Sequence, residues 1–181
     1  MREQDNPTST RRRDFMLRLG SAALLAGTPL CYTGAAFAQA AAQPDLAGTD
    51  ETGKRLRLAD YAGRACLVSF FTSGCNLCLN DLKLMREFNG DNRGKSFVML
   101  GVSLDEQPDD YQEYAKLIAL TVPAQQRFPL LWRKAPGHSD SFGAITSMPT
   151  HFVLDKSHKL VRTRLGSFRP NDWDDLWTLL G

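Results

Sequence analysis

The sequence predicts an α/β fold in which helices flank a mixed central sheet. Continuous apolar runs predict strands that are buried on both faces, and the segments between them show the spacing of amphipathic helices. Near the C-terminus a short turn joins two further strand-like segments, so the order is strand, helix, strand, helix, strand, hairpin and helix. Helical connections produce parallel pairs and a hairpin produces an antiparallel pair, which makes the sheet mixed.

The first half of the chain supplies the clearest elements. Residues 50–54 have the composition of a turn, and residues 55–58 alternate like a short strand. Residues 65–71 form an apolar run typical of a central strand. Residues 75–88 show helical spacing, and Asn89-Gly90 is a usual helix end. The predicted buried stripe is Cys78, Leu82, Met85 and Phe88, with Asp81, Lys83 and Arg86 mostly on other faces.

The second half repeats this pattern. Residues 96–103 form another apolar strand, and Pro108-Asp109-Asp110 opens a helix to about Leu120, since proline and acids favour a first turn. The remaining predictions are a strand at 128–132, a helical turn at 139–143, a strand at 150–154, a turn at 156–159, a strand at 160–165 and a helix at 171–180. In that last helix Trp173 and Trp177 should face the sheet, and Asp172, Asp174 and Asp175 should be solvated.

Composition indicates one soluble domain with a sizeable core. The chain has 181 residues, of which 43% are hydrophobic and 23% charged. Residues 1–38 hold five basic and three acidic side chains, and the remainder holds 17 of each. An even balance without a basic stripe argues against a nucleic-acid partner.

Residues 1–38 have the organisation of a cleavable export signal. Basic residues are followed by a mildly apolar stretch and by the small-x-small motif Ala36-Phe37-Ala38. Arg12-Arg13-Asp14-Phe15 resembles the twin-arginine signature, with a general secretory signal as the alternative. A lipid anchor at Cys31 is disfavoured because no small residue precedes it. The mature domain is therefore expected at residues 39–181, in the periplasm.

The cysteines that follow the signal favour redox chemistry. Cys66, Cys75 and Cys78 are an odd number, which disfavours a disulfide scaffold, and no second pair is present for a four-cysteine zinc site. We interpret Cys75 and Cys78 as a redox dithiol and Cys66 as a buried bystander. No metal or organic cofactor is expected.

The dithiol lies between the strand at 65–71 and the helix at 75–88. A helix N-terminus offers free N–H groups and positive partial charge, which stabilise a thiolate and lower its pKa below the free value of about 8.5. Cys75 should therefore attack a substrate disulfide. Cys78, one turn further along and more shielded, should resolve the mixed disulfide.

Four stretches of the chain resemble the exported TlpA and ResA-like thiol–disulfide oxidoreductases of the thioredoxin-like superfamily, to which redoxin and AhpC/TSA proteins are related. They are PDLAGTDETGKRLRLADYAGR, LVSFFTSGCNLC, residues 105–131 and SMPTHFVLD. The resemblance covers roughly residues 44–180 and implies a thioredoxin-like fold with an N-terminal β-hairpin and a central insertion. It also implies a cis bond before Pro149, facing the dithiol, with the Met148 backbone free to pair with substrate.

The departures from that family fall at the dithiol. Gly74 replaces a usual tryptophan that faces substrate, and Leu77 replaces a usual proline, so both should alter the reduction potential. Gly74, Met148 and Pro149 are the expected substrate-binding residues. Ser69 stands where thioredoxin has a buried aspartate, and Asp81 stands where the family has a glutamate. We expect Asp81 to accept the Cys78 proton, with a solvated helix carboxylate as the alternative.

Three other functions are compatible with parts of the sequence. Thr72 and Cys75 give a peroxiredoxin-like T-x-x-C, although Val68 and Met148-Pro149 replace that family's proline and arginine. An SCO-like copper chaperone uses two cysteines and a histidine; His151 is close in sequence, but a strand histidine facing core or solvent is the simpler interpretation. A purely structural disulfide would close too small a loop to stabilise the fold much.

These observations together predict an exported, monomeric thiol–disulfide oxidoreductase that acts on cysteine pairs of other proteins. The family resemblance adds candidate substrates, namely apocytochromes before haem attachment and copper-site proteins of respiratory oxidases. It also implies a membrane electron donor.

Overall fold

A computed structural model describes residues 43–180 of the chain. The predicted export signal at residues 1–38 lies outside this range. Within residues 43–180 no helix combines the length and the hydropathy needed to cross a membrane.

The larger sheet has five strands in the order β5-β4-β3-β7-β8. Their bounds are β3 Ala65–Phe71, β4 Phe97–Ser103, β5 Leu130–Trp132, β7 Thr150–Leu154 and β8 Leu160–Leu165. The first three strands in this order are parallel, whereas β7 runs antiparallel to both β3 and β8. The prediction of a mixed central sheet is therefore confirmed.

A smaller antiparallel sheet has the order β2-β1-β6, with β1 Leu46–Thr49, β2 Arg55–Arg57 and β6 Ser139–Asp140. Its first two strands form the expected N-terminal β-hairpin. The prediction of a helical turn at 139–143 was wrong, because Ser139 and Asp140 pair with β1 instead. The Asp140 carboxylate accepts a hydrogen bond from the backbone N–H of Phe142, so this N–H group has a partner where the chain leaves β6.

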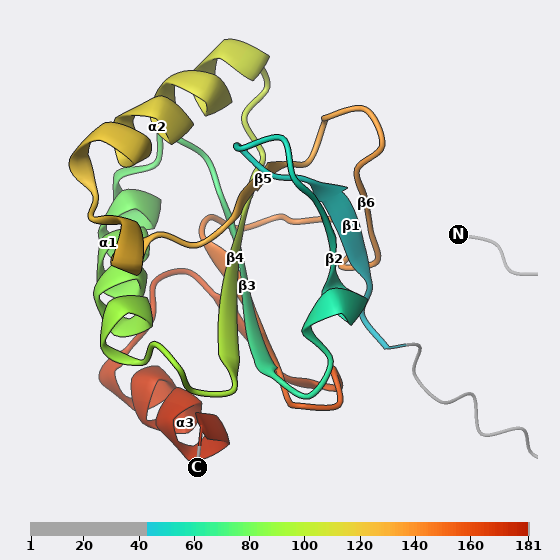
Figure 1. The fold of residues 1–181 in the computed structure, drawn as a ribbon, viewed down its shortest axis with the longest axis vertical. Coiled ribbons are helices and arrows are strands. Elements are labelled where there is room, and N and C mark those ends of the chain that lie inside the picture. Colours follow the sequence, from blue (N-terminus) through green and yellow to red (C-terminus); the bar gives the residue numbers. More distant parts are fainter. Residues whose placement is uncertain (1–42, 181) are drawn as a thin grey trace, which may run out of the picture. The chain divides into compact units, whose positions relative to one another are not determined.

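The two faces of the larger sheet are covered by different layers (Figure 1). Helices α1 Asn76–Asp91, α2 Pro108–Thr121 and α3 Pro170–Leu180 pack on one face. The smaller sheet and the 3-10 helix Leu58–Tyr61 pack on the other. Every residue of β3 is buried, because this central strand has a layer on each side. The strand ends at Phe71, and a short loop leads from its carboxyl end to the start of α1 at Asn76.

Helix α1 departs from its prediction at its end and on its buried face. It continues through Gly90, where an added Cβ would lie 2.9 Å from the Gln126 side chain, so a close approach explains the glycine rather than a helix stop. Asp81 and Arg86, predicted mostly off the buried stripe, are both buried. Arg86 donates a hydrogen bond to the Tyr114 hydroxyl of α2.

Helix α3 also differs from expectation at Asp172, which is 5% exposed instead of solvated. Its carboxylate accepts hydrogen bonds from the Arg169 backbone and the Arg162 side chain, so it holds the helix start against β8. Trp173, predicted to face the sheet, packs on Phe88 of α1, with ring centroids 5.2 Å apart. The neighbouring Trp177 is 47% exposed, so it covers the edge of the core.

A charged cluster fixes β6 and the segment before it. Arg133 binds both oxygens of Asp140, and His138 Nε2 lies 3.0 Å from the same carboxylate. The side chains of His138 and Asp140 are each 3% exposed. Burial opposes ionisation of Asp140, but hydrogen bonds from His138 and Arg133 outweigh it and lower the pKa to about 2.

We predict that Asp140→Asn will cost about 1–2 kcal/mol of the free energy of unfolding near neutral pH, after allowance for solvent screening. The pKa of Asp140 is about 2 when folded and about 3.9 when unfolded. The ionised carboxylate thus stabilises the fold fully above pH 4, and this contribution is lost as the pH falls through 2. Urea unfolding between pH 6 and pH 2 measures the difference between the two proteins.

Asp174→Asn is the matched control, because Asp174 is exposed on α3 and should change stability by less than about 0.5 kcal/mol. A difference between wild type and Asp140→Asn that stays constant from pH 6 to pH 2 would contradict the prediction.

Candidate active site

Cys75 and Cys78 are joined by a disulfide at the junction of β3 and α1, with their Cα atoms 5.2 Å apart. Cys75 is the N-cap residue of α1, so it stands where the helix has N–H groups without helical partners. The backbone N–H of Cys78 points at Cys75 Sγ, with N and Sγ 3.1 Å apart. The helix N-terminus is thus aimed at the first sulfur, as the sequence predicted.

The two cysteines differ in accessibility. Cys78 is completely buried in the core beneath α1, whereas Cys75 is half-buried and its neighbour Gly74 is exposed. Leu77, in the position between them, is 60% exposed. Only the Cys75 side of the disulfide can therefore meet the sulfur of another protein while the domain stays folded.

Asp105 holds the loop that leads into Cys75. Its Oδ1 accepts hydrogen bonds from the Ser73 backbone and the Ser73 hydroxyl, at 2.9 and 3.0 Å. Its Oδ2 accepts one from the Ser103 hydroxyl at the end of β4, at 2.7 Å. The side chain of Trp132 donates to the Asp105 backbone carbonyl. Asp105 is 5% exposed, so these donors take the place of water.

The loop before β7 lies against the same site. The peptide bond between Met148 and Pro149 is cis, as the resemblance implied. Met148 is half-buried and packs on the same core as Cys75, while Pro149 is buried. Gly74 and Met148 line one surface pocket together with Asp105 and Lys134. No neighbouring atom would lie within 4 Å of a Cβ added to Gly74, so the residue leaves the space beside Cys75 open.

Asp81 is buried one helical turn after Cys78 and is 4% exposed. Its Oδ2 accepts a hydrogen bond from the Phe168 backbone N–H at 3.0 Å, and it lies 3.2 Å from His151 Nε2. His151 on β7 is fully buried, and its Nδ1 lies 3.0 Å from the Ser69 hydroxyl on β3. The alternative of a solvated Asp81 is therefore wrong, and the side chains of Asp81, His151 and Ser69 meet in the buried space between α1 and the sheet.

Cys66 is remote from this chemistry. It is a free thiol on the other face of β3, in the core beneath the smaller sheet. Burial raises the pKa of the Cys66 thiol to about 12, partly offset by the charge of Arg64. A thiol that stays protonated is a poor nucleophile, which agrees with its predicted role as a bystander.

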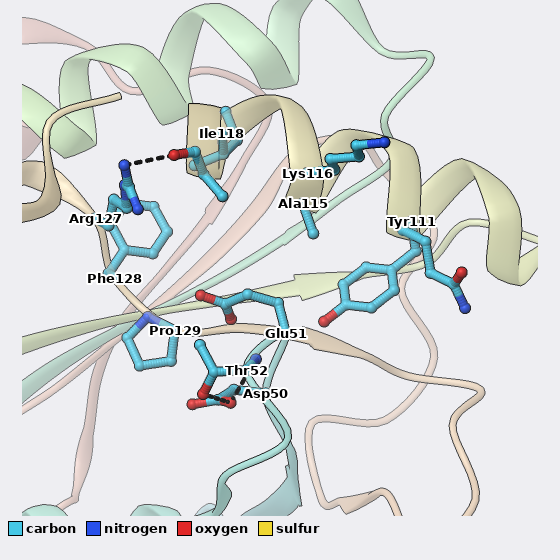
Figure 2. Close-up of a pocket in the computed structure, with 12 residues that line it drawn as sticks. Asp50, Glu51, Thr52, Tyr111, Ala115, Lys116, Ile118, Arg127, Phe128 and Pro129 are labelled. Carbon is cyan, nitrogen blue, oxygen red and sulfur yellow. Dashed lines mark hydrogen bonds between the residues drawn. The ribbon is translucent and has the colours of Figure 1, made fainter. Parts of the chain in front are cut away.

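A second pocket lies away from the cysteines, between α2, the turn after β1 and the segment before β5 (Figure 2). Figure 2 shows Glu51 in this pocket between Tyr111 and Phe128. The Glu51 carboxylate accepts a hydrogen bond from the Leu130 backbone, and Tyr111 donates to the Leu130 carbonyl. Burial raises the pKa of Glu51 above its usual range. These contacts fasten the hairpin and α2 to β5.

Within residues 43–180 no three histidine, cysteine or acidic side chains gather in a group that could hold a metal ion. His151, considered as a copper ligand beside the two cysteines, has its two ring nitrogens directed at Ser69 and Asp81 instead.

The sequence predicted the dithiol, Asp81 and the loop at Met148-Pro149, and the structure brings all of them to one end of β3. It did not predict Asp105 or His151 as parts of the site. A signal for Asp105 was present, because it comes two positions after a buried strand, and polar residues just beyond the carboxyl ends of such strands often belong to functional sites. For His151 the sequence offered only an apolar neighbourhood, which also suits a core histidine.

The comparisons with known proteins agree on one group. The AhpC/TSA family matches the chain over residues 39–163. The thiol-disulfide oxidoreductase ResA of Geobacillus thermodenitrificans is 24% identical over 137 residues, which are 76% of this chain and 75% of the relative. The exposed lipoprotein thioredoxin Etrx1 of Streptococcus pneumoniae has a TM-score of 0.55 at 26% identity, covering 75% of this chain and 97% of that one.

A further solved structure supports the fold. The thiol:disulfide interchange protein of the thioredoxin family from Chlorobium tepidum has a TM-score of 0.61 at 23% identity. The similarity covers 76% of this chain and 94% of that one.

We predict that Asp105→Ala will destabilise the domain by about 1–3 kcal/mol, because it leaves buried donors without an acceptor. It should also slow the reaction of reduced Cys75 with a small aromatic disulfide, since the loop that positions Cys75 loses its anchor. Urea unfolding and stopped-flow absorbance measure the two effects. Glu113→Gln, on the exposed face of α2, is the control. An Asp105→Ala protein with the stability and the Cys75 rate of wild type would disprove the anchoring role.

Proposed function

The chain belongs to the AhpC/TSA family and is a TlpA/ResA-like thiol–disulfide oxidoreductase of thioredoxin-like fold, and we propose that its Cys75–Cys78 pair exchanges disulfides with cysteine pairs of other proteins. The observation that carries this proposal is the asymmetric disulfide at the N-terminus of α1, with Cys75 accessible and Cys78 fully buried. A nucleophile at the surface and a shielded resolving thiol are what two-step exchange requires.

In the reducing direction the Cys75 thiolate attacks one sulfur of the substrate disulfide, and the other substrate sulfur leaves as a thiolate. Cys78 then loses its proton and attacks Cys75 Sγ. The bond between Cys75 and the substrate breaks, and the substrate leaves as a dithiol with two electrons gained by its sulfurs. The protein ends with the Cys75–Cys78 disulfide that the structure contains. The same steps in reverse oxidise a dithiol substrate.

We propose that substrate lies across Gly74, Met148 and Pro149. Gly74 leaves open space beside Cys75, and Met148 lines the same pocket. An extended substrate segment would pair with the Met148 backbone, which is a form of strand addition. Leu77, 60% exposed in the position between the cysteines, adds an apolar contact for a protein partner.

Asp81 is proposed to take the proton from Cys78 in the second step. It is buried on the same face of α1, three residues from Cys78, a spacing at which helical side chains are neighbours. A thiol in an apolar core ionises poorly on its own, so a carboxylate beside it supplies the base that the step needs.

The proposed location is the periplasm, reached through the twin-arginine signal at residues 1–38. The Streptococcus pneumoniae neighbour is described as an exposed lipoprotein, which fits activity outside the cytoplasm. Such a protein would act as a monomer and would take electrons from a membrane donor. Apocytochromes and copper-site proteins of respiratory oxidases are the proposed substrates.

We predict that wild-type protein will catalyse reduction of insulin disulfides by dithiothreitol and that Cys75→Ser will abolish this activity. Cys78→Ser should instead accumulate a mixed disulfide between Cys75 and substrate, because the resolving thiol is absent. Mass spectrometry of the non-reduced protein detects that adduct.

Cys66→Ala is the control for these variants and should keep full activity, because Cys66 lies on the far face of β3 with its pKa raised to about 12. Consumption of hydrogen peroxide at a rate matching insulin reduction, or activity that survives Cys75→Ser, would refute the proposed function.

We predict that Asp81→Asn will slow the second step about 100-fold at neutral pH, the lower end of the usual contribution of a general base. The first step, attack by Cys75, should be unaffected. Rapid-mixing measurements with a chromogenic disulfide separate the two steps. Equal second-step rates for both proteins at every pH would remove Asp81 from the mechanism.

A further inference from the structure

A polar pair interrupts the apolar face of the sheet that lies beneath α1. On this face β3 presents Ala65, Leu67 and Phe71 to the core, with Ser69 among them. Ser69 is directly opposite His151 of β7, so the two side chains point to the same side of the sheet. Both side chains are at least 98% buried.

His151 links β3 to α1 through its two ring nitrogens. Nδ1 lies 3.0 Å from Ser69 Oγ, and Nε2 lies 3.2 Å from Asp81 Oδ2. The ring also packs against Phe168, with centroids 4.6 Å apart. The backbone N–H of Phe168 donates to the same Asp81 oxygen at 3.0 Å. The His151 imidazole and the Asp81 carboxylate are therefore held by contacts that join four segments, namely β3, α1, β7 and the segment before α3.

The chemistry of these groups assigns the direction of each hydrogen bond. A carboxylate can only accept, so Nε2 carries a proton and donates it to Asp81 Oδ2. A hydroxyl can donate or accept, so Ser69 donates to Nδ1 of the neutral ring. Asp81 Oδ2 thus receives two N–H donors. Within residues 43–180 no hydrogen bond reaches the other oxygen, Oδ1.

We propose that His151 is a positioning residue for the second step of disulfide exchange, with Ser69 fixing its tautomer. The ring holds Asp81 by Oδ2 and leaves Oδ1 free to take the proton of Cys78. This inference rests on the proposed function of Asp81, and it extends that function to two residues on the central strands. Thioredoxin has a buried aspartate at the position that Ser69 occupies in this chain. The base proposed here is instead Asp81 of α1, which His151 of β7 holds from the sheet.

One proton passes from Cys78 to Asp81 and then leaves the site. The Cys78 thiol gives its proton to Asp81 Oδ1 as its sulfur attacks Cys75 Sγ, and the substrate thiolate leaves. Protonated Asp81 still accepts the Nε2–H bond at Oδ2, so His151 keeps one orientation throughout. Asp81 then gives the proton to the departing thiolate or to water, and it is ready for another cycle.

A further charged side chain, Arg164 of β8, is opposite His151 in the sheet. Its Nε donates a hydrogen bond to the Ser167 carbonyl and lies 3.3 Å from Asp172.

The test follows both steps of exchange with dithiobis-nitrobenzoate. Attack by Cys75 releases one coloured thiolate in a phase that depends on reagent concentration. Resolution by Cys78 releases the second in a phase that does not. His151→Gln keeps a side-chain N–H donor for Asp81 but lacks the ring and the second ring nitrogen that Ser69 contacts. Stopped-flow absorbance from pH 5 to pH 9 gives both rates for wild type and variant.

We expect the second phase of His151→Gln to slow at least about 10-fold at pH 7, because the amide keeps a donor but loses the ring that Ser69 and Phe168 hold in one orientation. The pH profile of its second phase should differ from that of wild type, because Asp81 has lost the ring that holds its Oδ2. The first phase should change by less than 2-fold. Ser69→Ala should slow the second phase too, with His151 still in place, and it offers a test that does not depend on the folding of His151→Gln.

His138→Gln is the matched control, because His138 is equally enclosed and also lies 3.0 Å from a buried carboxylate, that of Asp140 on β6. It should lower stability and leave both phases as in wild type. Second-phase rates and pH profiles of His151→Gln and Ser69→Ala that match wild type would overturn the role of His151 while leaving disulfide exchange intact. A wild-type protein without a second phase would overturn both proposals.

Discussion

The burial of β3 on both of its faces constrains the rest of the structure. The strand pairs with β4 and β7 along its edges and is covered by helices on one face and by the smaller sheet on the other. The backbone N–H and C=O groups of β3 therefore bond to its neighbouring strands, and its buried side chains contact other protein groups. The dithiol follows where this strand ends, so the reactive sulfurs are placed by the fully buried central strand.

Two buried carboxylates, those of Asp105 and Asp81, lie near this end of the strand, and each needs hydrogen-bond donors because it is shielded from water. Asp105 accepts two hydrogen bonds from Ser73 in the loop before Cys75 and one from Ser103 of β4, and Asp81 is held by His151 and the Phe168 backbone. A buried charge without such donors would cost several kcal/mol. With them, the Asp105 carboxylate anchors the loop before Cys75, and the Asp81 carboxylate is held three residues after Cys78 on α1, where we propose that it acts as the base.

Local patterns predicted the elements well where one physical signal dominated. The apolar runs at 65–71 and 150–154 match β3 and β7, because a strand buried on both faces needs apolar side chains throughout. The patterns failed where a tertiary partner overrode the local signal. Gly90 does not end α1, because its lack of a side chain serves the contact with Gln126. Residues 139 and 140 form a strand because β1 offers them a free edge.

The sequence by itself determined the reactive pair and its place between a central strand and a helix N-terminus. These depend on spacing within a few residues, which a chain displays directly, whereas the proline loop, about 70 residues away, was predicted from the family resemblance. The tertiary structure alone decided which buried polar groups lie near the pair. Asp81 and His151 are 70 positions apart, and Ser73 and Asp105 are 32 apart. Only the pairing of β3 with β7 and β4 brings such residues together, because sheet register decides which side chains share a face.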